Sequence, residues 1–326
     1  MPTLAVTFET NARARALIVA LLEGAADPVW LTELDDTGRA AALVAADAIL
    51  ARDSGKELRP REAAMTGRAK LVQFMTAGVD HVPLSQFPAE APIACNGGAY
   101  ADSMAEHALA MTLAAAKRLL IEHQALVAGE FNQFKPNRSL RGMVCGILGF
   151  GGIGIAIARL MRGLGLRVHA INRSGRTAED VDWIGTQDDL ATLLRVADVL
   201  VVSAPLTRRT LGMLGAAELA LMKPDAILVN LARGELIDEA ALFAHLQAHP
   251  AFFACIDAWW VEPVRHGSFR MDQPFLTLPN VIGSPHNSGS VPGNFEGGLR
   301  NAIANIRRAL AGDTPRHVVG DEERML

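Results

Sequence analysis

Residues 143–174 read MVCGILGFGGIGIAIARLMRGLGLRVHAINRS. The run Val144–Leu148 is apolar throughout, which is typical of a parallel strand buried on both faces. Apolar residues recur at helical spacing over 153–164, and a second apolar run at 166–171 indicates the next strand. This stretch therefore predicts a strand, a glycine-rich turn, a helix and a second strand, in that order.

Three glycines in the turn, Gly149, Gly151 and Gly154, have the spacing G-x-G-x-x-G. The first such glycine permits a tight turn, the second lets the backbone approach a pyrophosphate, and the third lets helix and strand pack closely. Free N–H groups and the positive dipole end at the start of the helix add a site for phosphate. Because the motif lies between a strand and a helix, it predicts dinucleotide binding.

The length of 326 residues indicates about two domains. Half of the residues are hydrophobic, which is enough apolar material for two cores. The formal net charge is −4 and no block of Lys and Arg occurs, so we expect no nucleic-acid partner. The sequence has neither a signal-like N-terminus nor an apolar stretch long enough to span a bilayer, so we expect a cytoplasmic protein without membrane contact.

The three cysteines, Cys95, Cys145 and Cys255, are far apart in the sequence. Cys145 and Cys255 lie within apolar, strand-like runs. We interpret the cysteines as buried free thiols of a reducing compartment, and we expect neither a disulfide nor a metal site.

Residues 1–98 alternate between short apolar runs and Ala-rich helical segments, which favours an open parallel α/β sheet. The predicted elements are a helix at 12–22 and strands at 4–8, 30–34, 48–51, 71–75 and 93–95. The turn at Ala77 and Gly78 follows the fourth strand. This turn either offers backbone N–H groups to an anion or only reverses the chain, and the local sequence leaves both interpretations open.

A long helix that is apolar over most of its surface is predicted at 99–120, and an exposed polar loop at 129–141. A helix of this kind is buried, either between domains or against a second subunit. Glu106 and His107 on this helix are interpreted as structural residues.

The alternation of strands and helices continues beyond the glycine motif. The predicted elements are strands at 197–203, 226–230, 252–256 and 281–283, and helices at 188–195, 215–222, 238–248 and 298–310. If the last helix returns to the first domain, residues 99–286 form a dinucleotide-binding domain inserted into a second domain made of 1–98 and 287–326. Both domains are predicted to be doubly wound parallel α/β sheets.

Three polar residues follow predicted strands beyond the glycine motif: Arg233, Glu262 shortly after Asp257, and His286. Each residue alone fits an ordinary surface or packing position. The carboxyl ends of parallel strands meet at one edge of a sheet, so we expect these residues to line one crevice. Hydride transfer from a dinucleotide to a ketone requires groups that bind a carboxylate, polarise a carbonyl and donate a proton.

A series of motifs in one order resembles the D-isomer-specific 2-hydroxyacid dehydrogenase family. These motifs are AGVDH (77–81), MAEH (104–107), the glycine motif, APLT (204–207), NLARG (230–234), Asp257 with Glu262-Pro263, and SPH (284–286). The resemblance implies an NAD(P)-dependent reductase of small 2-oxo acids, with a Rossmann-like cofactor domain inserted into a flavodoxin-like substrate domain and an active-site cleft between them. It also implies a homodimer formed largely through the cofactor domains.

The resemblance also implies roles for the polar residues. His286 would donate the proton in reduction and accept it in oxidation, while Glu262 would orient the imidazole and favour its protonated form. Arg233 would bind the substrate carboxylate and carbonyl with its planar fork. The N–H groups of Ala77 and Gly78 would bind the other carboxylate oxygen.

The cofactor contacts implied by the resemblance come from the glycine loop, the strand ends and the residues around His286, with Asp257 near the nicotinamide carboxamide. The full set is Met104, Gly149, Gly151, Gly152, Ile153, Gly154, Asn172, Arg173, Ser174, Ala204, Pro205, Leu231, Ala232, Arg233, Asp257, His286, Ser288 and Gly289.

The end of the second strand departs from the pattern of family members that prefer NAD, which usually place Asp there. This sequence has Asn172, followed by Arg173, Ser174 and Arg176. A carboxylate would repel the 2′-phosphate of NADP, whereas Arg and Ser hold one. We therefore expect NADP(H) to be preferred and NAD(H) to remain possible. In the alternative interpretation Arg173 is a solvated loop residue and either cofactor binds.

Two competing functions share parts of this pattern. Formate dehydrogenases resemble it with Gln in place of Glu262, and formate oxidation needs no proton transfer to an alcohol oxygen, so the Glu262–His286 pair favours 2-hydroxyacid chemistry. Some relatives are dinucleotide-sensing corepressors, which would be expected to carry extended tails or a partner surface.

The sequence does not single out one substrate. Glyoxylate and hydroxypyruvate are the leading expectations, and an NADH-linked enzyme for a larger 2-oxo acid is the alternative. Trp259 and Trp260 either narrow the pocket or belong to the core or a subunit interface.

Overall fold

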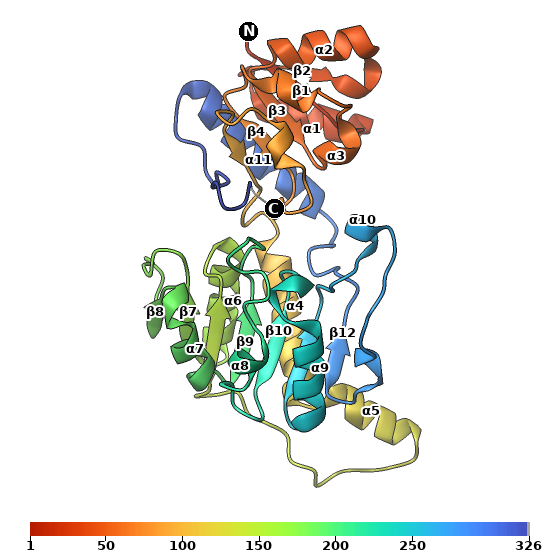
Figure 1. Cartoon of the computed structure of the whole chain (residues 1–326), viewed down its shortest axis with the longest axis vertical. Helices are drawn as coiled ribbons and strands as arrows, with labels where there is room; N and C mark the ends of the chain where they lie inside the picture. The colour runs from red at the N-terminus through yellow and green to blue at the C-terminus, as the bar shows by residue number, and fades with distance from the viewer. Residues whose placement is uncertain (325–326) are drawn as a thin grey trace. The chain divides into compact units, whose positions relative to one another are not determined.

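The computed structural model describes residues 1–324. The chain divides into two compact units: unit 1 is formed by Met1–Tyr100 and the chain from Pro292 onward, and unit 2 by Ala101–Val291. Each unit is a parallel sheet with helices packed on it (Figure 1). The prediction of two doubly wound parallel α/β sheets is confirmed.

Unit 1 contains a five-stranded sheet in the order β2-β1-β3-β4-β5, which is the flavodoxin-like order. Its strands are β1 (Thr3–Val6), β2 (Asp27–Trp30), β3 (Ala48–Ala51), β4 (Val72–Phe74) and β5 (Ile93–Ala94). Its helices are α1 (Ala12–Leu22), α2 (Asp36–Ala45), α3 (Ser54–Glu57) and α11 (Asn294–Ala311), with 3₁₀ turns η1 (Leu31–Glu33), η2 (Ala63–Thr66) and η3 (Leu84–Gln86).

The two faces of this sheet bury separate clusters of side chains, because successive residues of a strand point to opposite faces. Leu4 and Val6 pack with residues of α1 and α11 on one face. Ala5 and Ile49 pack with Leu43 of α2 on the other. The C-terminal helix α11 therefore completes the core of the unit that the N-terminal residues begin.

Unit 2 contains a seven-stranded sheet in the order β12-β11-β10-β9-β6-β7-β8. Counted from β6, this is the 3-2-1-4-5-6 order of Rossmann folds with one further strand, and the order reverses between β6 and β9. The strands are β6 (Val144–Leu148), β7 (Arg167–Ile171), β8 (Trp183–Gly185), β9 (Val199–Val202), β10 (Ile227–Asn230), β11 (Phe253–Ile256) and β12 (Val281–Gly283).

The helices of unit 2 cover both faces of its sheet. α4 (Ala101–Ala116) and α6 (Gly152–Gly163) contribute to one buried cluster, and α7 (Leu190–Val196), α8 (Ala216–Leu219) and α9 (Glu239–Ala248) to the other. The remaining elements are α5 (Leu119–Val127), α10 (Pro263–His266), and the 3₁₀ turns η4 (Gln187–Asp189), η5 (Gly234–Leu236) and η6 (Phe275–Thr277). Figure 1 shows α5 extending away from the sheet of unit 2.

The strand predicted at 30–34 is wrong in position. The strand is Asp27–Trp30, paired with β1 from Thr3↔Asp27 to Val6↔Trp30, and a 3₁₀ turn follows it. β2 is an edge strand, so Pro28 is tolerated there although proline usually argues against a strand. Leu31, which the prediction placed in the strand, is instead fully buried in the 3₁₀ turn.

The single helix predicted at 99–120 is also wrong, because α4 and α5 are separated at Arg118, whose φ is 53°. A distant segment satisfies the end of α4: the Arg138 N–H donates to the Ala116 carbonyl, and the Lys117 ammonium donates to the Arg138 carbonyl. Apolar spacing cannot reveal such a contact. The short edge strand β8 was not predicted at all.

Cys145 and Cys255 are free and buried, as predicted, and burial raises the pKa of both thiols. Cys95 is also free and is partly buried. Among residues 1–324, no helix combines the length and apolarity needed to cross a membrane.

Candidate active site

The turn between β6 and α6 has the geometry that its glycines predict. Gly149 has φ +100°, and a Cβ built there would lie 2.3 Å from the Ala204 nitrogen, so only glycine fits. A Cβ on Gly154 would lie 2.4 Å from the Gly149 carbonyl oxygen, so α6 can approach the turn this closely only because residue 154 is glycine. The Ser203 hydroxyl, after β9, donates to the Gly149 carbonyl at 2.7 Å. The turn is therefore fixed at the point where the strand order reverses.

Gly151 is different, since no atom lies within 4 Å of a Cβ built on it. It is the N-cap of α6, and no side chain caps that helix end. The first turn of α6 contains no acidic residue, so the N–H groups that begin at Gly152 and Ile153 meet no negative side chain of their own helix. Open space beside a helix N-terminus fits the pyrophosphate of a dinucleotide.

The loop after β7 is organised by Asn172. Its Oδ1 accepts the Ser174 N–H at 3.1 Å, and its Nδ2 donates to the Arg176 carbonyl at 2.8 Å. Arg173, Ser174 and Arg176 are exposed. The acidic residues that follow, Glu179, Asp180 and Asp182, form ion pairs with Arg159 and Arg162 of α6.

The segments after β9 and β10 approach the same edge of the sheet. Ala204, Leu231 and Ala232 are buried, whereas Pro205 is exposed. The Asn230 side chain closes the turn after β10 by accepting the Ala232 N–H and donating to the Arg233 carbonyl. The Arg233 guanidinium donates to the Ala232 carbonyl at 2.7 Å. Arg233 is therefore held at the turn rather than extended into solvent.

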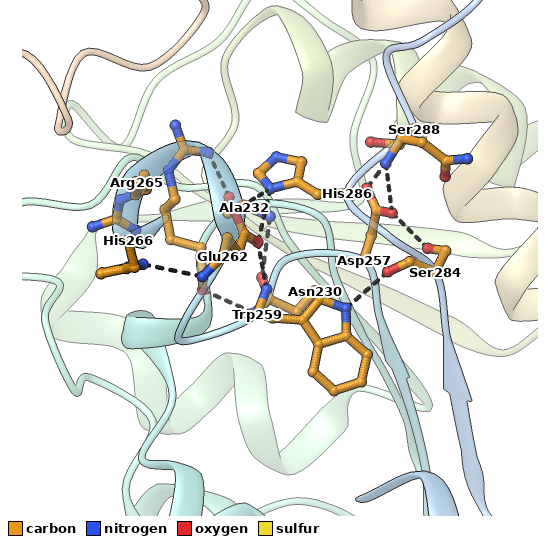
Figure 2. A network of polar contacts seen from close by, with 12 residues as sticks. Asn230, Ala232, Asp257, Trp259, Glu262, Arg265, His266, Ser284, His286 and Ser288 are labelled. Carbon is orange, nitrogen blue, oxygen red and sulfur yellow. Dashed lines mark hydrogen bonds and ion pairs between the residues drawn. The ribbon is translucent and has the colours of Figure 1, made fainter. Parts of the chain in front are cut away.

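Glu262 and His286 are in direct contact (Figure 2). The His286 Nδ1 lies 2.9 and 2.8 Å from the two Glu262 carboxylate oxygens. The Trp259 N–H donates to Glu262 Oε1 at 2.7 Å and holds the carboxylate from the other side. Because a carboxylate accepts, Nδ1 carries the proton, and no partner for Nε2 is recorded among residues 1–324. The His286 side chain is 33% exposed, while that of Glu262 is 8% exposed.

The charge state of Glu262 follows from its surroundings. Burial alone would raise the pKa of this carboxyl. The hydrogen bond and charge of His286, the Trp259 N–H and the charge of Arg233 outweigh that effect, so the pKa of Glu262 lies below its usual range. Glu262 is therefore an anion at neutral pH that faces the His286 imidazole. The predicted trio of Arg233, Glu262 and His286 is brought together within unit 2.

Asp257 is fully buried at the end of β11. The Ser284 hydroxyl donates to its Oδ1 at 2.5 Å and the Asn287 N–H at 3.2 Å, while the Ser288 N–H donates to Oδ2 at 3.3 Å (Figure 2). The segment that carries His286 is thereby fixed to β11, because the His286 N–H also donates to the Asp257 carbonyl.

Ser288 has a buried hydroxyl for which no partner is recorded in the described part of the chain. A buried hydroxyl without a partner is costly, and a ligand that offers a hydrogen bond would remove that cost. Gly289 follows and is partly exposed. Met104, on α4, packs against the cluster that covers one face of the sheet. These residues thus fit a dinucleotide that lies along the edge from the glycine turn to His286.

The Ala77–Gly78 turn belongs to unit 1, at the carboxyl end of β4. Both residues are partly exposed, and the preceding Thr76 has a buried hydroxyl without a recorded partner among residues 1–324. The Asn96 N–H donates to the Thr76 carbonyl and fixes the start of the turn. The predicted substrate residues are thus divided between the two units.

Both tryptophans near Glu262 have structural contacts. Trp259 is 4% exposed and donates its indole N–H to the Ser284 carbonyl, while Trp260 donates to the Ile237 carbonyl and stacks on Phe275. They belong to the core of unit 2. His107 and Ser284 contact the Asp257 carboxylate, and sequence reasoning assigned neither of them a part in the site.

Comparisons with known proteins bear directly on this site. A family model described as the NAD-binding domain of D-isomer specific 2-hydroxyacid dehydrogenases matches residues 109–288. Glyoxylate/hydroxypyruvate reductase B of Enterobacter agglomerans is 34% identical over 226 residues, covering 68% of each chain. Glyoxylate reductase of Thermococcus gammatolerans is 30% identical over 78% of this chain and 77% of its own. The match to D-3-phosphoglycerate dehydrogenase of Archaeoglobus fulgidus, at 31% identity, spans only 44% of that longer protein.

Solved structures agree on the fold. A Pyrobaculum aerophilum protein described as a candidate formate dehydrogenase has a TM-score of 0.80 at 26% identity and covers the full length of both chains. A glycerate dehydrogenase related protein from Thermoplasma acidophilum has a TM-score of 0.63 at 31% identity, covering 94% of this chain and 99% of its own.

Proposed function

Since the chain belongs to the D-isomer specific 2-hydroxyacid dehydrogenase family, we propose that this oxidoreductase reduces a small 2-oxo acid to its 2-hydroxy acid by hydride transfer from NADPH. The product has the D configuration where it is chiral. Glyoxylate and hydroxypyruvate are the proposed substrates, supported by the names of the reductases that match this chain. The contact between Glu262 and His286 carries the proposal, because it prepares a proton donor for an alkoxide.

The proton comes from His286 in this proposal. Nδ1 is held by Glu262, so the imidazolium presents its second proton on Nε2, the ring nitrogen that has no recorded partner among residues 1–324. The ionised Glu262 holds Nδ1 and so fixes the orientation of the ring. Loss of the Nε2 proton to the alkoxide completes the reduction and leaves a neutral imidazole. In the reverse direction the same nitrogen accepts the proton.

The substrate carboxylate is assigned to Arg233 and to the N–H groups of Ala77 and Gly78. The planar guanidinium suits a carboxylate and a neighbouring carbonyl oxygen, and its charge opposes the negative charge that develops on that oxygen.

The nicotinamide dinucleotide supplies the hydride when it is bound. We assign its pyrophosphate to the N–H groups at Gly151, Gly152 and Ile153, where the turn leaves open space. We assign a 2′-phosphate to Arg173 and Ser174. Asn172 uses its amide to shape this loop and brings no carboxylate to it, which supports the preference for NADPH.

Formate oxidation is the nearest alternative, since one of the matching structures carries that description. Formate oxidation needs no proton transfer to an oxygen atom, so it does not require a carboxylate that orients the histidine. The ionised Glu262 beside His286 therefore favours 2-oxo acid reduction.

The test replaces His286, whose φ of 50° favours Asn over Ala as the substitute, because Asn tolerates the left-handed region. His286→Asn should lower kcat with glyoxylate or hydroxypyruvate by about 10²- to 10⁴-fold and retain NADPH binding, since only the proton donor is removed. Steady-state rates and a calorimetric titration with NADPH measure the two effects. Turnover equal to that of the unaltered protein would refute the assignment.

We also propose a homodimer formed by unit 2. α5 buries none of its residues, and together with the following loop it exposes six large apolar side chains: Leu119, Leu120, Leu126, Val127, Phe131 and Phe134. Phe134 is 92% exposed. A cluster of this kind on a surface is typical of a subunit contact.

A further inference from the structure

A chain of side-chain contacts connects α4 to the Asp257 carboxylate. The His107 Nε2, on α4, lies 3.0 Å from the Ser284 hydroxyl oxygen. That hydroxyl lies 2.5 Å from Asp257 Oδ1, and the His107 Nε2 itself is 3.7 Å from the same oxygen. All three residues belong to unit 2, on α4 and at the ends of β12 and β11.

The direction of these hydrogen bonds follows from the number of protons available. The buried Asp257 carboxylate accepts hydrogen bonds, so the Ser284 hydroxyl donates its only proton to Asp257. Ser284 Oγ is then the acceptor for His107, and the His107 Nε2 must carry a proton. The chain therefore runs as a donor series from His107 through Ser284 to Asp257.

The two oxygens of Asp257 differ in how many donors they meet. Oδ1 accepts from the Ser284 hydroxyl and the Asn287 N–H, which occupies both of its lone pairs. Within residues 1–324, Oδ2 accepts only the Ser288 N–H, at 3.3 Å. One acceptor position therefore remains on Oδ2, beside the Ser288 hydroxyl that also lacks a recorded partner in the described chain.

We propose that His107 is a positioning residue, which holds the Asp257 carboxylate through Ser284 so that Oδ2 accepts an N–H from the carboxamide of the nicotinamide. This inference rests on the proposed function for the presence of that cofactor. His107 and Asp257 both contact the Ser284 oxygen, and the His107 Nε2 lies only 3.7 Å from Asp257 Oδ1, so the two contacts together restrain rotation of the hydroxyl and hold the carboxylate in place. His107 acts from α4 and does not touch the cofactor itself.

The test compares His107→Leu, which removes the donor, with His107→Gln, whose amide nitrogen can take the place of Nε2. Each is titrated calorimetrically with NADPH and with its 3-acetylpyridine analogue, in which a methyl group replaces the carboxamide NH₂. His107→Leu should weaken NADPH binding by about tenfold, the size expected for one hydrogen bond to a charged group, and leave the analogue unchanged. His107→Gln should bind both as the unaltered protein does.

Ser284→Ala gives an independent check on the same chain of contacts. It should weaken NADPH binding as His107→Leu does, and the double variant should be no weaker than Ser284→Ala alone, because the two residues act in series. Equal weakening of NADPH and the analogue by His107→Leu would mean that His107 only supports the fold, and no weakening of either would also overturn the inference.

These titrations do not depend on turnover. If the unaltered protein binds NADPH but reduces no 2-oxo acid, the proposed function fails while the comparison between NADPH and its analogue still decides the role of His107.

Discussion

Glu262 is a buried carboxylate that stays charged because its partners outweigh its burial. The His286 imidazole and the Trp259 N–H both contact it, and Arg233 adds a positive charge nearby. A buried anion with such partners is stable only while they remain in place. At the scale of single residues, the proposed function therefore depends on one short contact between Glu262 and His286.

Replacing this carboxylate should change both rate and stability. Glu262→Gln should lower kcat by about 100-fold, since the imidazolium loses its counter-ion, and leave NADPH affinity unchanged. It should also lower the free energy of unfolding at pH 7 by about 2 kcal/mol, the size of a charge-assisted hydrogen bond. Steady-state kinetics and urea denaturation measure these effects.

The pH dependence of that stability difference has a definite sign. The pKa of Glu262 is depressed in the folded state, so its contribution is fully present above the unfolded value of about 4.3 and is lost as pH falls through the folded value. The difference between the unaltered protein and Glu262→Gln should therefore shrink on acidification below about pH 4.3. Glu90→Gln, at an exposed position of unit 1, is the control and should leave the free energy of unfolding unchanged. A difference that grows on acidification would contradict the charge state assigned to Glu262.

Sequence reasoning expected Arg233, Glu262 and His286 to lie close together because parallel strands end at one edge of a sheet, and the structure brings them together. It gave His107 no part in the proposed site, because His107 lies on a helix whose apolar pattern indicated burial. The contact of His107 with Ser284 joins residues 177 positions apart, and no local signal marks such a pair.

At the scale of elements, the segment formed by β6, its turn and α6 is the one that the sequence predicted most fully. The spacing of the glycines predicts where a side chain cannot fit, and the structure shows that a Cβ would clash at Gly149 and at Gly154. Elements without such a reason were placed less well. β2 lies three residues earlier than predicted, and α4 ends at a contact made by Arg138 from a distant loop.

Two glycines of this element should respond differently to alanine. Gly154→Ala places a methyl group 2.4 Å from a carbonyl oxygen, so it should destabilise the protein by about 1–3 kcal/mol. Gly151→Ala meets no protein atom, so it should leave the melting temperature unchanged but weaken NADPH binding about tenfold or more, because the methyl group occupies the space assigned to the pyrophosphate.

Gly163→Ala is the matched control at the other end of α6, where the added methyl group also meets no atom. It should keep full NADPH affinity and raise stability by about 0.5–1 kcal/mol. Thermal melting and calorimetric titration separate the three variants. Full NADPH affinity in Gly151→Ala would argue against the pyrophosphate site at this turn.

At the scale of the whole molecule, the residues assigned to the proposed site come from both units. Unit 2 carries the glycine turn and the trio of Arg233, Glu262 and His286, and unit 1 carries the Ala77–Gly78 turn. The presence of two parallel sheets was predictable, because alternation of strands and helices extends along the chain. The apolar helix predicted at 99–120 allowed a subunit contact as one of two interpretations, and the proposed dimer rests on the apolar side chains that α5, with no fully buried residue, leaves exposed.

The proposed dimer can be tested through its exposed apolar side chains. Val127→Glu combined with Phe134→Glu should convert the dimer to a monomer, because charges at an apolar contact lose their hydration on association. Light scattering coupled to size exclusion measures the mass. Val44→Glu, on α2 of unit 1 and 58% exposed, is the control and should leave the mass unchanged. A monomeric mass for the unaltered protein would contradict the proposal.

The most direct test of the central claim is the initial rate of NADPH and of NADH oxidation with glyoxylate and with hydroxypyruvate. We predict turnover with at least one of these acids, with kcat/KM for NADPH at least about tenfold above that for NADH, and loss of this ratio in Arg173→Ala, because Arg173 is assigned to the 2′-phosphate. Comparable kcat/KM for the two nucleotides would contradict the cofactor assignment. Absence of turnover with both acids, in a protein that binds NADPH, would contradict the proposed reaction.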